Sequence, residues 1–199
     1  MQEKVMVLRS SAGKLLTGGR VTQLASASDV HQLNFQYMGE NEVSEDYVHY
    51  VFLDPEQGVQ LVLVDDYLED IAYLSFQHVP EQAITAMQAW LSEHIGLFTL
   101  EEVRAALTAD LEGNASFLTH LGLMEHRETP DAATAILLKT ALNSSVTETV
   151  ERALVAAQLL GWPELHNAVQ ALAVHSPDAH LRDFAGKVWV QLESSSILI

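Results

Sequence analysis

The sequence contains no cysteine among its 199 residues. Disulfide bonds, thiol catalysis and cysteine-ligated zinc sites are therefore excluded. The chain also lacks a run of eighteen apolar residues, so we expect no membrane-spanning helix and no membrane partner. The segment before residue 9 is too short and too charged for a signal peptide. A cytoplasmic location is the default expectation.

Basic residues are scarce and unevenly placed. Residues 21–103 contain no lysine or arginine but fifteen aspartates and glutamates, and the formal net charge of the whole chain is −17. A long stretch that carries only negative charges produces an electrostatic field that attracts cations or basic proteins and repels nucleic acid. Because phosphate contacts require Lys and Arg, we expect no nucleic-acid partner. Solubility is an alternative explanation, since added Asp and Glu keep proteins in solution.

Motifs of known catalytic chemistry are missing as well. Gly13 and Lys14 do not form a phosphate-binding loop, because no glycine stands five positions before the pair. The sequence has no dinucleotide fingerprint, no nucleophile elbow and no zincin pair of histidines. We therefore predict a protein that is not an enzyme and that has no cofactor and no metal.

Two clusters nevertheless contain residue types that bind metals. His175, Asp178 and His180 flank one turn, and a loop can bring such side chains together around a metal. The second cluster is a group of four carboxylates: Asp65, Asp66, Glu69 and Asp70. Its members resemble the oxygen donors of a calcium site but lack the spacing and the glycine of an EF-hand. Helix-end histidines and a solvated turn are the simpler interpretations.

The first half of the chain carries the pattern of β-strands. Four runs that are apolar or alternate in polarity, separated by short connections, predict an antiparallel meander. These runs cover residues 33–37, 47–53, 60–64 and 71–76. The basic segment before them is expected to add an edge strand and a glycine turn at Gly18 and Gly19. One helix is expected after Pro80, ending near Gly96.

The apolar period becomes helical in the second half. Thr99 followed by Glu102 fits a capping box at the start of a helix. Segments rich in alanine and leucine then continue almost to the end of the chain, joined by short loops, which is typical of helical hairpins. We therefore predict an α+β fold, with a β-rich domain at residues 1–98 and an all-α domain at residues 99–199.

A repeat of thirty residues is visible near the C-terminus. Residues 151–159 align with residues 181–189, so that Arg152 matches Arg182 and Ala156 matches Gly186. The equal spacing predicts two successive structural units of the same kind.

The repeated segment resembles a HEAT repeat. In residues 177–185 an acid precedes a hydrophobic–Arg pair, and a small residue follows three positions later, as at the start of the second helix of a HEAT unit. Residues 161–163, Gly-Trp-Pro, resemble the turn between the two helices of one unit. The resemblance covers about residues 129–192, with a third unit in residues 99–128 that matches at fewer positions. It implies a stack of antiparallel helical hairpins, a protein-binding surface, and a structural role for Arg152 and Arg182.

Charge and resemblance together predict a protein–protein interaction module that binds a basic partner protein. An immunity protein or antitoxin that masks a nuclease-like toxin suits this charge, because carboxylates can imitate phosphate and steer association. An assembly adaptor is equally compatible. The expected partner-binding residues are acids on two connections of the sheet: Glu40, Glu42, Glu45, Asp46, Asp65, Asp66, Glu69 and Asp70.

Two alternatives come from other classes of protein. One is a metal-dependent or small-ligand enzyme with a site between the two domains. The other is a structural subunit of a homo-oligomer, with the apolar tail Ile197, Leu198 and Ile199 as its contact. The sequence does not indicate an oligomeric state.

Overall fold

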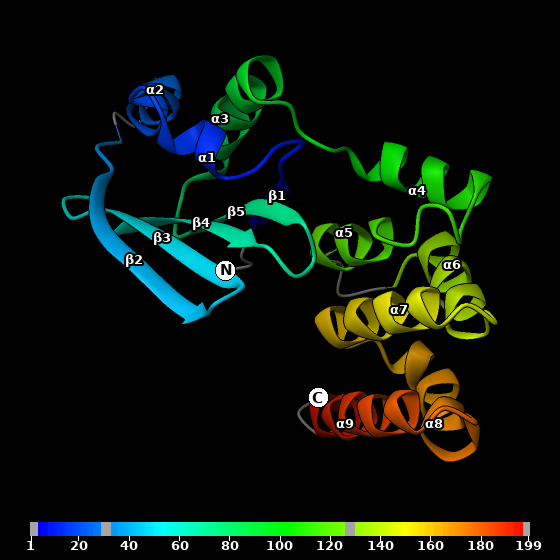
Figure 1. The fold of residues 1–199 in the computed structure, drawn as a ribbon. Helices are drawn as coiled ribbons and strands as arrows, with labels where there is room; N and C mark the ends of the chain where they lie inside the picture. Colours follow the sequence, from blue (N-terminus) through cyan, green and yellow to red (C-terminus); the bar gives the residue numbers. More distant parts are fainter. Residues whose placement is uncertain (1–3, 29–32, 126–129, 197–199) are drawn as a thin grey trace. The chain divides into compact units, whose positions relative to one another are not determined.

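The chain divides into two compact units, Met1–Phe98 and Thr99–Ile199, in a computed structural model that describes residues 4–28, 33–125 and 130–196. The described part of the first unit contains a five-stranded antiparallel sheet, and that of the second contains stacked helices (Figure 1). The predicted α+β fold class is therefore confirmed.

The sheet of the first unit has the strand order β1-β5-β4-β3-β2, with every neighbouring pair antiparallel. Its strands are β1 (Lys4–Val7), β2 (Gln36–Ser44), β3 (Tyr47–Asp54), β4 (Val59–Asp66) and β5 (Ile71–Gln77). Strands β2 to β5 form the predicted meander, and the predicted edge strand β1 pairs with β5. The two glycines of the predicted turn, Gly18 and Gly19, adopt φ angles of 64° and 69°.

Strand β2 lies further along the chain than the sequence predicts. The sequence places a strand at residues 33–37 and a connection after it, whereas the strand spans Gln36–Ser44. An edge strand with exposed side chains does not need the apolar alternation that sequence analysis looks for. Glu40 and Glu42 therefore lie in a strand and not in a loop.

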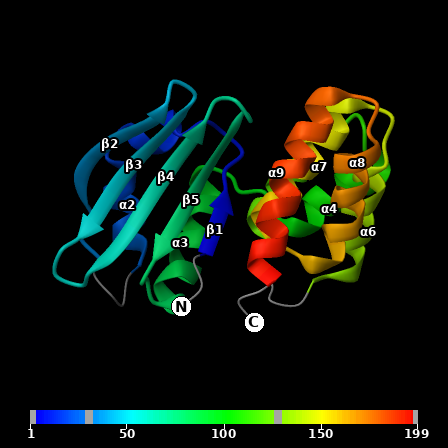
Figure 2. The same cartoon turned by 90° about the horizontal axis from the view of Figure 1, so that it is seen from below.

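Three helices cover one face of this sheet: α1 (Gly13–Leu16), α2 (Arg20–Ala27) and α3 (Glu81–His94) (Figure 2). Of these, only α3 is expected from the sequence. Helix α2 has only eight residues, and three of them, Val21, Thr22 and Ser26, have low helix propensity. Burial of Leu24 and Ala25 against the sheet stabilises it, and that contact is tertiary.

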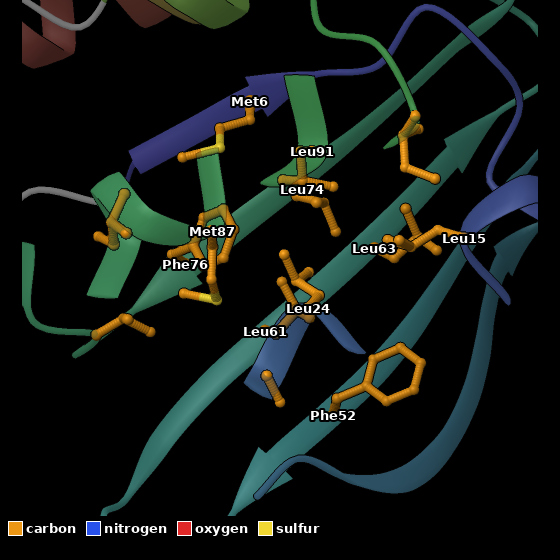
Figure 3. Close-up of a cluster of buried hydrophobic side chains, with 14 of the residues drawn as sticks. Met6, Leu15, Leu24, Phe52, Leu61, Leu63, Leu74, Phe76, Met87 and Leu91 are labelled. Carbon is orange, nitrogen blue, oxygen red and sulfur yellow. The ribbon is translucent and has the colours of Figure 1, made fainter. Parts of the chain in front are cut away.

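The core of the first unit lies between the sheet and these helices (Figure 3). Leu61 and Leu63 of β4 are two residues apart, so they point to the same face, where they are fully buried. Leu15 and Leu24 from α1 and α2 join them in the same cluster. This packing fixes the short helices α1 and α2 over β3 and β4.

The second unit contains six α-helices in its described residues: α4 (Leu100–Ala109), α5 (Phe117–Met124), α6 (Ala132–Leu142), α7 (Thr147–Leu160), α8 (His166–His175) and α9 (Ala179–Ser196). They pair as the hairpins α4/α5, α6/α7 and α8/α9. Helices α4, α6 and α8 contact one another in turn on one side of the stack, and α5, α7 and α9 do so on the other (Figure 1). The predicted capping box is present, since the Glu102 N–H donates to Thr99 Oγ1 at 3.2 Å and the Thr99 N–H donates to Glu102 Oε2 at 2.9 Å.

Two details bear on the expected repeat. Arg182 Nη1 donates to the carbonyl oxygens of Ser176 and Pro177, at 2.7 and 3.0 Å, and so holds the turn that precedes α9. Gly161 ends α7 in the left-handed conformation, and the 3-10 helix η1 (Pro163–Leu165) leads into α8. The turn at residues 161–163 therefore joins two successive hairpins. The resemblance to a HEAT repeat predicts instead that it joins the two helices of one hairpin, and that prediction is wrong.

Candidate protein-binding surface

The predicted acids gather at one end of the sheet. Glu45 and Asp46 form the turn between β2 and β3, and the other turn, between β4 and β5, contains Glu69 and Asp70. Because β3 pairs with β4, the two turns are neighbours. The Tyr67 N–H donates to the carbonyl oxygen of Asp46 at 2.8 Å and ties them together. Acids more than twenty positions apart in the sequence thus lie side by side.

Glu40 and Glu42 extend this group along β2. They pair with Tyr50 and Val48 of β3, and directly paired residues of antiparallel strands share a face. Tyr50 packs against the core cluster, so this is the face that the helices cover. Both glutamates are nevertheless exposed.

Asp65 differs from the other seven predicted residues. Its side chain is buried, with an exposed fraction of 7%. It accepts hydrogen bonds from the Tyr67 side chain and from the backbone N–H of Ala12, the residue that precedes α1. Burial raises the pKa of Asp65 although these two bonds act in the opposite direction. Asp65 therefore positions α1 and cannot meet a partner, which corrects its assignment as a surface residue.

The remaining seven acids are called the acidic rim below: Glu40, Glu42, Glu45, Asp46, Asp66, Glu69 and Asp70. Asp66 and Glu69 are half-buried, and the Glu69 N–H donates to Asp66 Oδ1 at 3.0 Å. The other five side chains are exposed. The rim is therefore accessible at both turns and along the edge strand.

A groove of about 370 Å³ opens on the same face of the sheet, beside Glu40. Its lining, called the aromatic groove below, consists of Leu16, Gly19, Arg20, Val21, Tyr37, Tyr50 and Phe52. The segment around α1 and α2 forms one side, and β2 and β3 form the floor. The rings of Tyr37 and Phe52 are 5.3 Å apart between centroids, and Tyr37 is 54% exposed.

Two tyrosine hydroxyl groups connect the groove to the buried Asp65. Burial raises the pKa of Tyr50 to about 12, with further contributions from its hydrogen bond to Tyr67 and from the charges of Asp65 and Glu40. The Tyr50 hydroxyl is therefore protonated at neutral pH. The Tyr67 hydroxyl donates a hydrogen bond to the Asp65 carboxylate, so its oxygen accepts the hydrogen bond from the Tyr50 hydroxyl. These two hydrogen bonds hold the hydroxyl of Tyr67, a residue that is 56% exposed and precedes Glu69 and Asp70 in the β4–β5 turn.

The aromatic groove is not expected from the sequence. It depends on the placement of α2, which the sequence does not predict, and on a ring pair formed across two strands. One sequence signal points to it: all five tyrosines of the chain lie within residues 37–73. Tyrosine is enriched at protein interfaces because its ring is apolar and its hydroxyl is polar.

The two groups of potential metal-binding side chains, at residues 175–180 and 65–70, have other roles in the structure. Asp178 Oδ1 accepts the backbone N–H groups of His180 and Leu181 at 2.7 and 3.2 Å and so caps α9, while His180 Nε2 lies 3.3 Å from Glu151 Oε1. Asp65 and Asp66 are adjacent strand residues and point to opposite faces of the sheet. Among the described residues, no three His, Asp or Glu side chains are close enough to hold a metal ion.

A second groove, of about 510 Å³, lies in the helical unit at the loops that connect α6 to α7 and α8 to α9. Asn143, Ser144, His175 and Asp178 contribute polar groups to its lining. The tail at residues 197–199, predicted as an oligomer contact, lies outside the described residues.

In the described part of the chain, no helix is long and apolar enough to cross a membrane. Comparison of the sequence with protein-family models, with curated proteins and with solved structures finds no match. The candidate surface is therefore identified from its geometry alone: exposed carboxylates border a groove lined by tyrosines.

Proposed function

We propose that this protein is a non-catalytic protein-binding module and that the acidic rim and the aromatic groove together bind a basic partner protein. One observation carries the proposal. A groove lined by Tyr37, Tyr50 and Phe52 lies beside clustered carboxylates, and these rings and carboxylates belong to residues 21–103, which contain no lysine or arginine.

The two parts of the surface supply different contributions to binding. Aromatic side chains in a groove are typical anchors of protein interfaces, because they bury a large area with few rotatable bonds. Charges at the border of an interface mainly raise the association rate and select the partner. Seven acids from two turns and two strands produce a negative potential of the kind that steers a basic protein.

The nature of the partner follows from this charge. A nuclease-like toxin exposes basic residues that contact phosphate, and an immunity protein or antitoxin masks them with carboxylates. An adaptor that holds a basic subunit during assembly requires the same complementarity. In both cases the helical unit serves as a scaffold of stacked hairpins similar to HEAT-like proteins.

Capture from the native cell lysate tests this function with three immobilised proteins: the unchanged chain, a rim variant and a control. The rim variant is Glu40→Lys/Glu42→Lys. The control is Glu56→Lys/Glu93→Lys, which changes the net charge equally at exposed positions in the β3–β4 turn and in α3. We expect a basic protein that the unchanged chain and the control retain and that the rim variant releases. Equal retention by all three proteins would overturn the proposal.

A further inference from the structure

The two edges of the sheet are protected to different degrees. Strand β1 has four residues and carries Lys4, and charged residues on short edge strands prevent pairing with another chain. The C-terminal end of its outer backbone is also occupied, since the Phe98 N–H donates to the Val7 carbonyl at 3.1 Å and the Arg9 N–H donates to the Gly96 carbonyl at 3.0 Å. This short edge therefore offers little room for a further strand.

Strand β2 forms the opposite edge and is open. It has nine residues and no lysine, arginine or proline, and within residues 4–28, 33–125 and 130–196 only β3 pairs with it. Its register with β3 shifts between Tyr37 and Gly39 and again between Glu42 and Ser44. Residues 39–42, between these shifts, pair continuously with β3 and leave one row of backbone groups unpaired at the edge.

We propose that residues 39–42 of β2 accept an extended basic segment of the partner protein as a sixth strand, with one apolar side chain of that segment in the aromatic groove. The inference rests on the proposed function and specifies how the same surface holds its partner. Strand addition supplies affinity through backbone hydrogen bonds, and pockets on one face supply specificity through alternate side chains.

Charge defines the chemistry of the incoming segment. Glu40 and Glu42 are two residues apart and point to the groove face, so the residues of an added strand that lie opposite them share that face. Two lysines or arginines at the same spacing would pair with these carboxylates. Arg20 also lines the groove and disfavours a cation there, so the groove beside the Tyr37–Phe52 ring pair suits an apolar side chain.

A second copy of this chain is a poorer occupant of the same edge. Pairing of β2 with β2 would place Glu40 and Glu42 of each copy against like charges, and like charges across paired strands are destabilising. The occupant we infer is therefore a different protein, with a segment in which two basic residues alternate with other residues and an apolar residue follows on the same face.

Displayed random peptides of about ten residues, long enough to span a strand, provide a defined probe. They are selected on the full-length protein and counter-selected on Glu40→Lys/Glu42→Lys. We expect enrichment of peptides with two basic residues at positions i and i+2 and an apolar residue on the same face. The absence of binders that distinguish the two proteins would overturn strand addition.

N-methylation of the peptide backbone, one position at a time, then tests the binding mode. In an added strand only alternate N–H groups face β2, so we expect methylation to weaken binding about tenfold or more at alternate positions and little between them. Uniform tolerance, or losses with a helical period, would overturn strand addition. If the lysate partner still depends on Glu40 and Glu42 in that case, the proposed function stands; if neither peptide nor lysate partner depends on them, the function fails as well.

Discussion

At the scale of single residues, two buried carboxylates at opposite ends of the sheet show how neighbours decide the behaviour of an acid. Burial tends to raise the pKa of Asp54, but it accepts backbone N–H groups from Asn34, Glu56 and Gln57 at 2.7, 3.0 and 3.0 Å, and its pKa is lowered. For Asp65 the balance is reversed, and burial raises its pKa. The ionised carboxylate of Asp54 therefore stabilises the fold, whereas ionisation of Asp65 destabilises it.

Asp54→Asn should therefore destabilise the protein at pH 7, by roughly 1–3 kcal/mol, because buried donors lose a charged acceptor. A lowered pKa gives stability that is present above the ordinary value of about 3.9 and is lost as the pH falls through the lower value of the folded state. The difference between variant and unchanged protein should thus shrink in acid. Urea unfolding of both proteins at pH 7 and below pH 4 measures this difference in stability.

Asp65→Asn is the matched control for this experiment. The raised pKa of Asp65 has the opposite effect on stability. Protonation of its carboxyl favours the folded state, so the protein loses stability as the pH rises above about 4. Replacing this charge with a neutral amide should leave stability at pH 7 unchanged or increased. Equal losses in the two variants would contradict the assigned roles of both carboxylates.

At the scale of elements, the helical hairpins pack closely at one glycine. A methyl group on Gly122 of α5 would lie 2.8 Å from the Cα of Ala156 in α7, closer than real contacts allow. Gly122→Ala should therefore separate the two helices and destabilise the protein by about 1–3 kcal/mol. Gly186→Ala in α9 is the control, since its methyl position has no neighbour from another described element within 4 Å, and the change should be neutral or stabilising. Similar urea midpoints for the two variants would contradict this packing.

A buried ion pair joins three helices of the same unit. Arg104 of α4 bonds to Glu125, which follows α5, and its Nη2 lies 2.7 Å from Thr134 Oγ1 of α6 and 3.1 Å from Asp131 Oδ1. Glu125 is fully buried, so removal of the guanidinium leaves a charge in a medium of low dielectric constant. Arg104→Met should cost about 3–5 kcal/mol in urea unfolding.

The double variant Arg104→Met/Glu125→Gln checks that explanation. Because the second change removes the unpaired charge, it should restore part of the lost stability. If the double variant is as unstable as the sum of its two single changes, Arg104 and Glu125 do not act as a pair.

Sequence analysis succeeds for elements whose signals are local. The aromatic and β-branched run of β3, the proline before α3 and the capping box at Thr99 all predict their elements correctly. It fails for α2 and for most of β2, where tertiary contacts and an exposed edge replace the apolar pattern. For the surface, it finds the acids of both turns but treats Asp65 as exposed, because burial depends on how α1 packs on the sheet.

At the scale of the whole molecule, charge repulsion should limit stability. Lys4 Nζ lies 2.9 Å from Glu81 Oε1, but the acids of residues 21–103 have no cation of their own segment to pair with. Raising the salt concentration from about 0.01 M to about 1 M shortens the range of charge interactions from about 30 to about 3 Å. The urea midpoint should therefore rise with added sodium chloride, and less so in a Glu40→Gln/Glu42→Gln variant. A midpoint independent of salt would show that these acids do not repel one another.

The association rate of the captured basic partner with the full-length protein tests the central claim most directly. Stopped-flow measurement at low and high salt compares the unchanged chain, Glu40→Lys/Glu42→Lys and the control Glu56→Lys/Glu93→Lys. If the acidic rim steers the partner, association of the unchanged chain slows by at least about tenfold at high salt, and the rim variant is slow at every salt concentration. The control should remain close to the unchanged chain. Rates that do not depend on salt, or that are equal in the rim variant and the control, would contradict the account.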